Sequence, residues 1–307
     1  MASDVRLWKE HVKFPFQDQL PLDPHPPFNA LTNYPTYPDR FYGSAYRENR
    51  LVDLELCWLE NEHLKAAICP TLGGRLWRMI DKHSGRDVIH AVDEGRSWNA
   101  GWGFGYLPGG LELNYPFAHS VTNMRLRESH MARQEDGSCT VTISETERHF
   151  RTRWAFSFTL RPGQARLEQR VMIENPNPWE TRYHYWSNCG IPADKDTVWI
   201  YPEVKSATHA ALPRKFSWPY YGGFRIDKLV NVPEPLGTYY DNTLDGYFGY
   251  WSPTDQMGAV HFSDKALLPG KKYWSWGWGR WANHAADQLD PQSRHYGEMQ
   301  AGRIIVQ

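Results

Sequence analysis

Glu298 and Gln300, near the C-terminus of this 307-residue chain, have the types and spacing for proton transfer. They alternate in the segment YGEMQAG, and residues two apart in a β-strand point to the same face. A carboxylate placed in this way can act as a general base if the fold brings an acid to the same substrate. His184 is the residue that the fold would have to bring near Glu298.

The segment TRYHYWSNCGI, residues 181–191, contains that histidine. His184, Trp186 and Asn188 alternate, so a strand would present them on one face. A histidine next to a stacking indole could exchange a proton with a sugar ring oxygen near neutral pH. The alternative is that His184 is a structural residue.

A third segment, GYLPGGLELNYPFAHS, spans residues 105–120. Gly109–Gly110 allow a sharp bend of the backbone. Glu112 and Asn114 follow at alternating positions and share a face if the segment is a strand. Together with His119, they could bind a pair of sugar hydroxyls. The alternative is a polar, solvated strand face.

A fourth segment, KKYWSWGWGRWANH, places Trp274, Trp276 and Trp278 at alternating positions. Three indoles on one strand face would form either a platform for a sugar or one wall of the core, and the sequence leaves both interpretations open. Arg75, Trp102 and Trp276 complete the set of residues that we expect to contact a substrate.

The composition also favours a carbohydrate. The chain has 15 Trp, 17 Tyr and 13 Phe residues. Buried indoles need partners for their N–H groups, so a core rarely uses so many of them. Aromatic rings stack on the flat faces of sugars, while carboxylates, amides and imidazoles bind sugar hydroxyls. A large aromatic core remains the alternative.

Charge and motif content exclude other classes of function. The net charge is −1, without the basic surface that nucleic acid requires. We find no apolar run of about 20 residues that would span a membrane. Metal-ligand spacings and nucleotide-binding motifs are also absent, so we expect no metal and no cofactor. Four cysteines, none in a CxxC pair, are expected to be reduced and mostly buried, which suits a cytoplasmic protein.

The segments that contain these residues are predicted to be β-strands. Polar and apolar residues alternate in many short runs with turn dipeptides between them, which predicts an all-β, large antiparallel sandwich. A Pro-rich segment, residues 1–45, is expected to be a wrapping arm, followed by one carbohydrate domain over residues 46–307. The one expected helix is short and lies around residues 281–289.

The chain also resembles a known superfamily. The segments NEHLKAAICPTLGGRLWRMIDKHSGRDVI, LPGGLELNYPFAHS, YHYWSNCGI, LPGKKYWSWGWG and YGEMQAG, between about residues 50 and 302, are similar to galactose mutarotase-like proteins. They resemble most the poorly characterised branch that is often fused to tetratricopeptide repeats. This resemblance implies a large antiparallel β-supersandwich that binds a sugar in a cleft on its concave face.

The same resemblance implies roles for individual residues. His184 would be the acid of an H-x-Y-x-N-like segment in which Trp186 replaces the tyrosine and Asn188 is retained. Glu298, followed by Gln300, would be the base. Together they would move a proton from the anomeric hydroxyl to the ring oxygen, and reclosure of the ring would give the other anomer. The Asn-Arg and His-Gly-Gly segments of mutarotases have no clean counterpart in this chain.

Several functions remain open at this point. The first is an aldose 1-epimerase-like enzyme that uses Glu298 and His184. The second is a glycoside hydrolase that uses Glu112 and Glu298, and an ion pair between Glu112 and Arg75 would count against it. The third is a binding module without chemistry, and the fourth is a purely structural role. The expected partner is a sugar or an oligosaccharide, and a homo-oligomer is possible.

Overall fold

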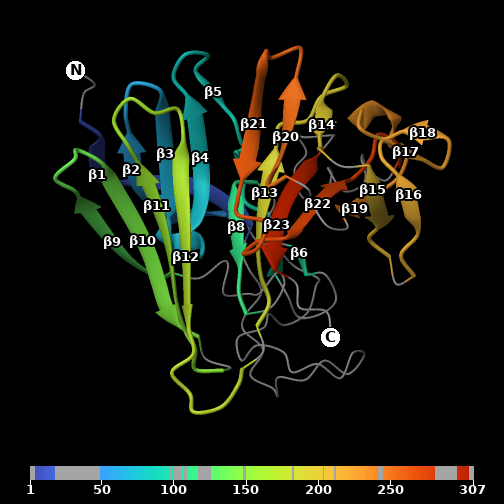
Figure 1. Cartoon of the computed structure of the whole chain (residues 1–307). Helices are drawn as coiled ribbons and strands as arrows, with labels where there is room; N and C mark the ends of the chain where they lie inside the picture. The colour runs from blue at the N-terminus through green and yellow to red at the C-terminus, as the bar shows by residue number, and fades with distance from the viewer. Residues whose placement is uncertain are drawn as a thin grey trace. The chain divides into compact units, whose positions relative to one another are not determined.

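The computed structural model describes residues 4–17, 49–96, 98–99, 105–106, 109–116, 126–147, 150–181, 183–202, 204–210, 212–240, 245–280 and 296–303. Its elements are almost all β-strands (Figure 1), which confirms the fold class predicted from the alternating pattern. The chain divides into two compact units. Unit 1 comprises Met1–Asp87, Asp93–Pro108 and Glu112–Tyr183, and unit 2 comprises Val88–Val92, Gly109–Leu111 and His184–Gln307.

Unit 1 contains strands of three sheets, which are antiparallel wherever their register is described. The first has the order β1-β2-β3-β4-β8, with β5 paired to β4, the second has the order β12-β11-β10-β9, and β6-β7 form the third. Its elements are β1 (Arg6–Gln17), β2 (Asn49–Glu60), β3 (Leu64–Cys69), the 3₁₀ helix η1 (Pro70–Leu72), β4 (Arg75–Asp81), β5 (Arg86–Asp87), β6 (Trp98–Asn99), β7 (Gly105–Tyr106), β8 (Leu111–Asn114), β9 (Glu128–Arg133), β10 (Cys139–Thr146), β11 (Arg153–Leu160) and β12 (Leu167–Glu174).

The N-terminal segment takes part in the first sheet. Residues 6–17 of the segment that we expected to be a wrapping arm form β1, which pairs with β2 along its whole length. Phe14 and Phe16 are buried, and the Phe14 ring meets Trp77 edge-on at 5.2 Å between centroids. Pro15 is compatible with this strand because β1 is at the edge of the sheet, where a missing N–H group costs no ladder hydrogen bond. Residues 18–48 lie outside the described part of the chain.

The second sheet of unit 1 shows the alternation from which it was predicted. Val141 and Ile143 of β10, and Phe156 and Phe158 of β11, are buried, while their neighbours are partly exposed. Gly74, which follows η1, has a φ of +78°, and a methyl group there would lie 2.5 Å from the Ile143 side chain. Glycine is therefore required at this turn for both its conformation and its size.

Unit 2 is also antiparallel wherever its register is described. Its main sheet has the order β13-β23-β22-β19-β15-β16, and β14-β20-β21 and β17-β18 form smaller sheets. The elements are β13 (Tyr185–Ile191), β14 (Val198–Ile200), β15 (Lys205–Thr208), β16 (Lys215–Ser217), β17 (Tyr220–Tyr221), β18 (Phe224–Arg225), the 3₁₀ helix η3 (Leu229–Asn231), β19 (Leu236–Tyr240), β20 (Tyr247–Ser252), β21 (Met257–Phe262), β22 (Gly270–Ser275) and β23 (Gly297–Arg303).

One face of the main sheet in unit 2 forms the core of that unit. Ile191 of β13, Tyr273 of β22, and Met299 and Ala301 of β23 are buried against side chains from β14, β20 and η3, namely Trp199, Phe248, Tyr250 and Leu229. Trp278 packs against the same cluster. Because these core residues alternate along each strand, the residues between them must point to the opposite face.

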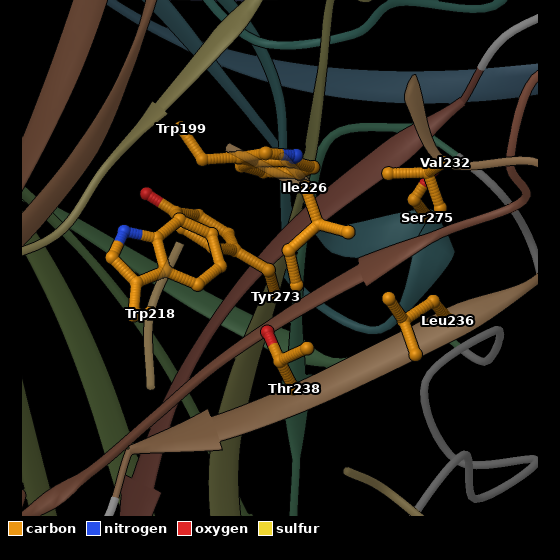
Figure 2. Close-up of a pocket in the computed structure, with 8 residues that line it drawn as sticks. All are labelled: Trp199, Trp218, Ile226, Val232, Leu236, Thr238, Tyr273 and Ser275. Atoms are coloured by element: carbon orange, nitrogen blue, oxygen red, sulfur yellow. The ribbon is translucent and has the colours of Figure 1, made fainter. Parts of the chain in front are cut away.

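A small pocket lies on the core side of unit 2. Figure 2 shows the rings of Trp199, Trp218 and Tyr273 around it, together with Ile226, Val232 and Leu236. Its cavity volume is about 10 Å³. Such a space holds at most about one water molecule. The pocket is therefore a packing defect of the aromatic core and is too small for a sugar.

The four cysteines are free, as expected. Cys57, Cys69 and Cys139 are buried and Cys189 is partly buried. Burial raises the pKa of both Cys69 and Cys189 to about 12, so their thiols are poor nucleophiles near neutral pH. Within the described residues, the chain forms no helix that is long and apolar enough to cross a membrane.

The packing of β1 can be tested by truncating Phe14. We expect Phe14→Ala to lower the free energy of unfolding by about 3 kcal/mol, because a buried ring that contacts Trp77 is lost. Lys13→Ala, at the exposed neighbouring position, is the control and should change stability little. Urea unfolding of both variants gives the measurement. Equal unfolding midpoints for Phe14→Ala and the wild type would contradict the packing of the Phe14 ring of β1 against Trp77.

Candidate functional site

The face of the unit 2 sheet opposite its core carries a row of buried polar residues. Asn188 of β13 is paired with Gln300 of β23, Gln300 with Lys272 of β22, and Lys272 with Tyr239 of β19. Residues directly opposite one another in an antiparallel ladder project to the same side. Asn188, Gln300 and Lys272 are all buried. We call this side of β13, β23, β22 and β19 the site face.

The next row of the site face contains the only carboxylate among its described residues. Glu298 is paired with Gly190 on one side and with Trp274 on the other, and Trp274 is paired with Gly237. Glu298 is 3% exposed. The Gln300 side-chain amide donates a hydrogen bond of 2.7 Å to Glu298 Oε2. The two residues predicted to alternate at the C-terminus therefore form one hydrogen-bonded pair on one face.

Gly190 makes room for two side chains next to Glu298. A methyl group on Gly190 would lie 2.8 Å from Tyr296 Oη and 3.2 Å from His90 Cβ. The His90 and Tyr296 rings meet edge-on with their centroids 5.2 Å apart. Because Gly190 faces Glu298 across the ladder, these two side chains lie beside the carboxylate. A larger residue in place of Gly190 would displace them.

Aromatic side chains line the site face around the polar rows. The Trp274 and Trp276 rings are perpendicular with centroids 6.1 Å apart, and Trp276 also contacts Tyr296 at 6.4 Å. His209 packs against both Tyr239 and Trp274. Both Trp274 and Trp276 are partly exposed, so their rings can contact a ligand. These rings could stack on the faces of a sugar.

Only two of the three alternating indoles belong to this face. β22 ends at Ser275, and Gly277 adopts a φ of +79°, which turns the chain. Trp278 consequently packs on the core cluster of unit 2. The three indoles therefore divide between the two roles that the sequence left open. Trp274 and Trp276 line the site face, and Trp278 is part of the core wall.

Lys272 is the one cation among the described residues of the site face. Its Nζ lies 5.6 Å from the ring centre of Trp186, 5.5 Å from that of Tyr239 and 5.3 Å from that of Trp274. Burial lowers the pKa of Lys272 to about 8, and the negative charge of Glu298 opposes this shift. Burial also raises the pKa of Tyr239 to about 12, so this phenol stays neutral.

The register separates His184 from Glu298. His184 precedes β13, and its ring is nearly parallel to that of Trp186 at 6.2 Å. The residue opposite Glu298 is Gly190, six positions further along the chain. Six residues of extended chain span about 20 Å. The predicted common face of His184, Trp186 and Asn188 is thus present, but His184 lies at its far end.

In unit 1, three predicted residues form a buried polar group. Arg75 Nη2 lies 3.7 Å from Glu112 Oε1, and the Asn114 amide donates a hydrogen bond of 3.2 Å to Glu112 Oε2. All three side chains are almost completely buried. The common face of Glu112 and Asn114 on β8 agrees with the alternation. Of the other expected substrate contacts, Trp102 and His119 lie outside the described residues.

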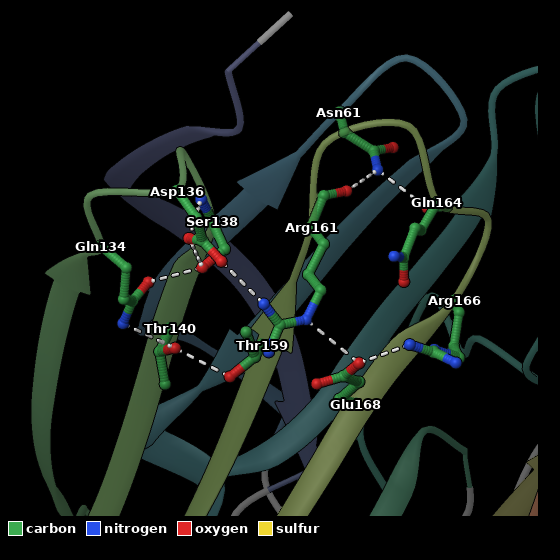
Figure 3. Close-up of polar contacts among 10 residues, drawn as sticks. All are labelled: Asn61, Gln134, Asp136, Ser138, Thr140, Thr159, Arg161, Gln164, Arg166 and Glu168. Carbon is green, nitrogen blue, oxygen red and sulfur yellow. Dashed lines mark hydrogen bonds and ion pairs between the residues drawn. The ribbon is translucent and has the colours of Figure 1, made fainter. Parts of the chain in front are cut away.

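A second polar cluster of unit 1 is satisfied by its own partners (Figure 3). Arg161 joins Asp136 at 2.8 Å and Glu168 at 3.2 Å, and Arg166 contacts the same oxygen of Glu168. The Asn61 amide donates to two loop carbonyls, those of Arg161 and Gln164. These groups tie the loop between β11 and β12 to neighbouring strands, so the cluster is structural.

Sequence reasoning did not identify four residues of the site face. The sequence pattern could have identified Lys272 and Tyr296, because Lys272 alternates with Trp274 and Tyr296 alternates with Glu298. Tyr239 and His90 carried no such signal, since only strand pairing and a distant loop bring them to this face. Within the described ranges, no three His, Cys, Asp or Glu side chains converge as metal ligands would.

Comparison with solved structures identifies the fold. A TPR-domain containing protein from Parabacteroides distasonis matches with a TM-score of 0.88 and 24% identity, over 100% of this chain and 52% of that one. This chain thus spans about half the length of that protein. A putative aldose 1-epimerase from Klebsiella pneumoniae subsp. pneumoniae matches with a TM-score of 0.58 and 10% identity, over 81% and 71% of the two chains.

A galactose mutarotase-like protein from Clostridium acetobutylicum gives a TM-score of 0.58 at 10% identity, over 83% of this chain and 88% of that one. At these identities the likeness shows the fold alone, which is the galactose mutarotase-like sandwich. A family model described as "Domain of unknown function (DUF5107)" matches residues 31–307. The chain has this sandwich fold and belongs to the DUF5107 family.

Proposed function

We propose that the site face binds a sugar and that the chain acts at its anomeric carbon as an aldose 1-epimerase-like enzyme. The observation that carries this proposal is the buried Glu298 carboxylate, which accepts a hydrogen bond from Gln300 and lies among aromatic rings. A carboxylate can accept the proton of a sugar hydroxyl, and the surrounding aromatic rings can stack on the faces of the sugar. The fold shared with a protein described as a putative aldose 1-epimerase supports the same assignment.

The proposed reaction needs one base and one acid. Glu298 removes the proton from the anomeric hydroxyl, and the C1–O bond of the ring breaks to give the open-chain aldehyde. The acid donates a proton to the released ring oxygen. Rotation about the C1–C2 bond and reversal of both proton transfers close the ring as the other anomer. The carboxylate and the acid return to their starting states, and no other reactant is consumed.

The acid has two candidates on different ends of the site face. Family resemblance favours His184, whereas the register favours His90 and Tyr296, which flank Gly190 opposite Glu298. Both groups of an acid–base pair must come within about 2.6–3.2 Å of the same sugar. The separation of His184 from Glu298 along β13 therefore supports His90, with Tyr296 fixing its ring, as the acid. His184 would then contact a remote part of the ligand.

Glycoside hydrolysis is less well supported. Its second carboxylate would be Glu112, which is paired with Arg75 and hydrogen-bonded by Asn114. An arginine partner favours the ionised carboxylate, whereas the general acid of a glycosidase must carry a proton. The ion pair between Arg75 and Glu112, which counts against glycoside hydrolysis, is therefore present.

The role of Glu298 can be tested with Glu298→Gln. We expect this variant to slow the interconversion of α and β anomers by about 10²- to 10⁴-fold, because the amide cannot accept the proton. Sugar binding should persist, since the shape of the side chain is kept. NMR of the anomeric protons of freshly dissolved aldoses and hexuronates measures the rate.

Glu174→Gln, at an exposed position of β12, is the matched control and should keep the full rate. An unchanged rate in Glu298→Gln would remove the base from the proposal. Binding without any acceleration, in the wild type as well, would favour a recognition module. New reducing ends from oligosaccharides would favour a hydrolase.

The identity of the acid can be tested with His90→Gln and His184→Gln. We expect His90→Gln to lower kcat by more than tenfold, with a smaller change in KM, because it removes a proton transfer. His184→Gln should act mainly on KM. The same NMR assay supplies both parameters. The reverse pattern would assign the acid to His184 and would show that the register does not limit its reach.

A further inference from the structure

Lys272 is a buried ammonium for which the described residues offer no hydrogen-bond acceptor. It is 8% exposed and lies over the rings of Trp186, Tyr239 and Trp274. Aromatic faces attract the charge but do not replace the acceptors that three N–H donors require. Among the described residues, no carboxylate comes within ion-pair distance of its Nζ. The N–H donors of this ammonium are therefore left to solvent or to a ligand.

The neighbouring lysine shows how the same chain satisfies a buried ammonium that has a structural role. Lys271 is 0% exposed and points to the other face of β22. Its Nζ donates hydrogen bonds of 2.6 Å to Ser263 Oγ and 2.8 Å to the Leu268 carbonyl. Lys272 has no such protein acceptors in the described part of the chain. This contrast indicates that Lys272 is placed for a ligand.

The position of Lys272 relative to Glu298 suggests the size of that ligand. Lys272 is paired with Gln300, two residues from Glu298 along β23, so Lys272 and Glu298 are diagonal neighbours on the site face. Diagonal pairs in an antiparallel sheet are about 7–8 Å apart. This distance joins backbone positions, and the long side chain of Lys272 can reach across it. The anomeric hydroxyl and the C5 substituent of a pyranose flank the ring oxygen and point outward from the same edge of the ring. A single sugar could therefore reach both charges.

We propose that Lys272 binds the carboxylate of a hexuronate whose anomeric hydroxyl faces Glu298. This inference rests on the proposed function and names its substrate class. A carboxylate would supply charge-assisted hydrogen bonds to an ammonium that is otherwise desolvated. It would also match the single positive charge that the described residues place on the site face. A doubly charged phosphate usually recruits several cationic groups.

The ammonium must be protonated for this contact, so the affinity depends on pH. The charged and titratable groups that face Lys272 are Glu298 from β23 and Tyr239 from β19, with His209 packed on Tyr239 and His184 on Trp186. The pKa of Lys272 is lowered to about 8. Hexuronate affinity should therefore be highest below this pKa and fall as the pH rises through 8 and above.

Isothermal titration with glucuronate, galacturonate, the corresponding hexoses and their 6-phosphates tests the inference in the wild type and in Lys272→Met. We expect the wild type to bind at least one hexuronate ten times more tightly than its neutral hexose. Lys272→Met should reduce that ratio to near one and remove the loss of affinity above pH 8. Lys205→Met, at an exposed site on β15, is the control and should keep the preference. Circular dichroism checks that each variant is folded.

The outcomes separate this inference from the proposed function. Equal binding of hexoses and hexuronates by the wild type would overturn the inference and leave the proposed function in place. So would a preference that survives in Lys272→Met. Tighter binding of hexose 6-phosphates than hexuronates would overturn the carboxylate assignment. Failure of every sugar to bind would overturn the proposed function and the inference together.

Discussion

Backbone pairing between β13, β23 and β22 determines which side chains share the site face. In this ladder Asn188 is opposite Gln300, and Gln300 is opposite Lys272. A shift of one residue in any strand would turn its polar residues into the core and its core residues outward. Met299 and Tyr273 in the apolar cluster of unit 2 oppose such a shift, because it would expose them to solvent. The core thereby fixes the geometry of the site.

This arrangement holds opposite charges on one buried surface. Glu298 and Lys272 are both desolvated, and a buried charge is costly unless it has partners. Gln300 provides a partner for Glu298, and aromatic rings surround Lys272. The packing on the other side of the same strands offsets part of the cost. Such a surface favours a ligand that is polar at defined points and flat elsewhere, as sugars are.

The buried group around Arg75 has a different character. Its guanidinium contacts Glu112, which is also hydrogen-bonded by Asn114, so the charges are largely compensated within unit 1. A compensated carboxylate fixes structure or anchors a hydroxyl more readily than it exchanges protons. Glu112 and Asn114 of the motif LELN therefore do share a strand face, but their geometry favours a positioning role over a catalytic one. The groups that we propose to react lie on the site face of unit 2.

The sequence by itself determined the strands and the faces within each strand. RLWRMID coincides with β4, and the alternation of Glu298 with Gln300 correctly predicted their shared face, because the period of two is a local property of extended chain. For residues 6–17 the local rule gave no strand, since prolines dominate the surrounding segment and only the pairing with β2 identifies β1.

Only the tertiary structure decided which strands are neighbours and in what register. That pairing brought Lys272 and Tyr239 to the site face, placed Gly190 opposite Glu298 and moved His184 to the far end of β13. It also admitted His90, whose segment gives no local sign of this position. These relations depend on contacts between residues distant in sequence, which the alternation within one strand cannot encode. The face to which a side chain points follows from the local geometry of its strand, whereas the strands that lie next to it are selected by long-range packing.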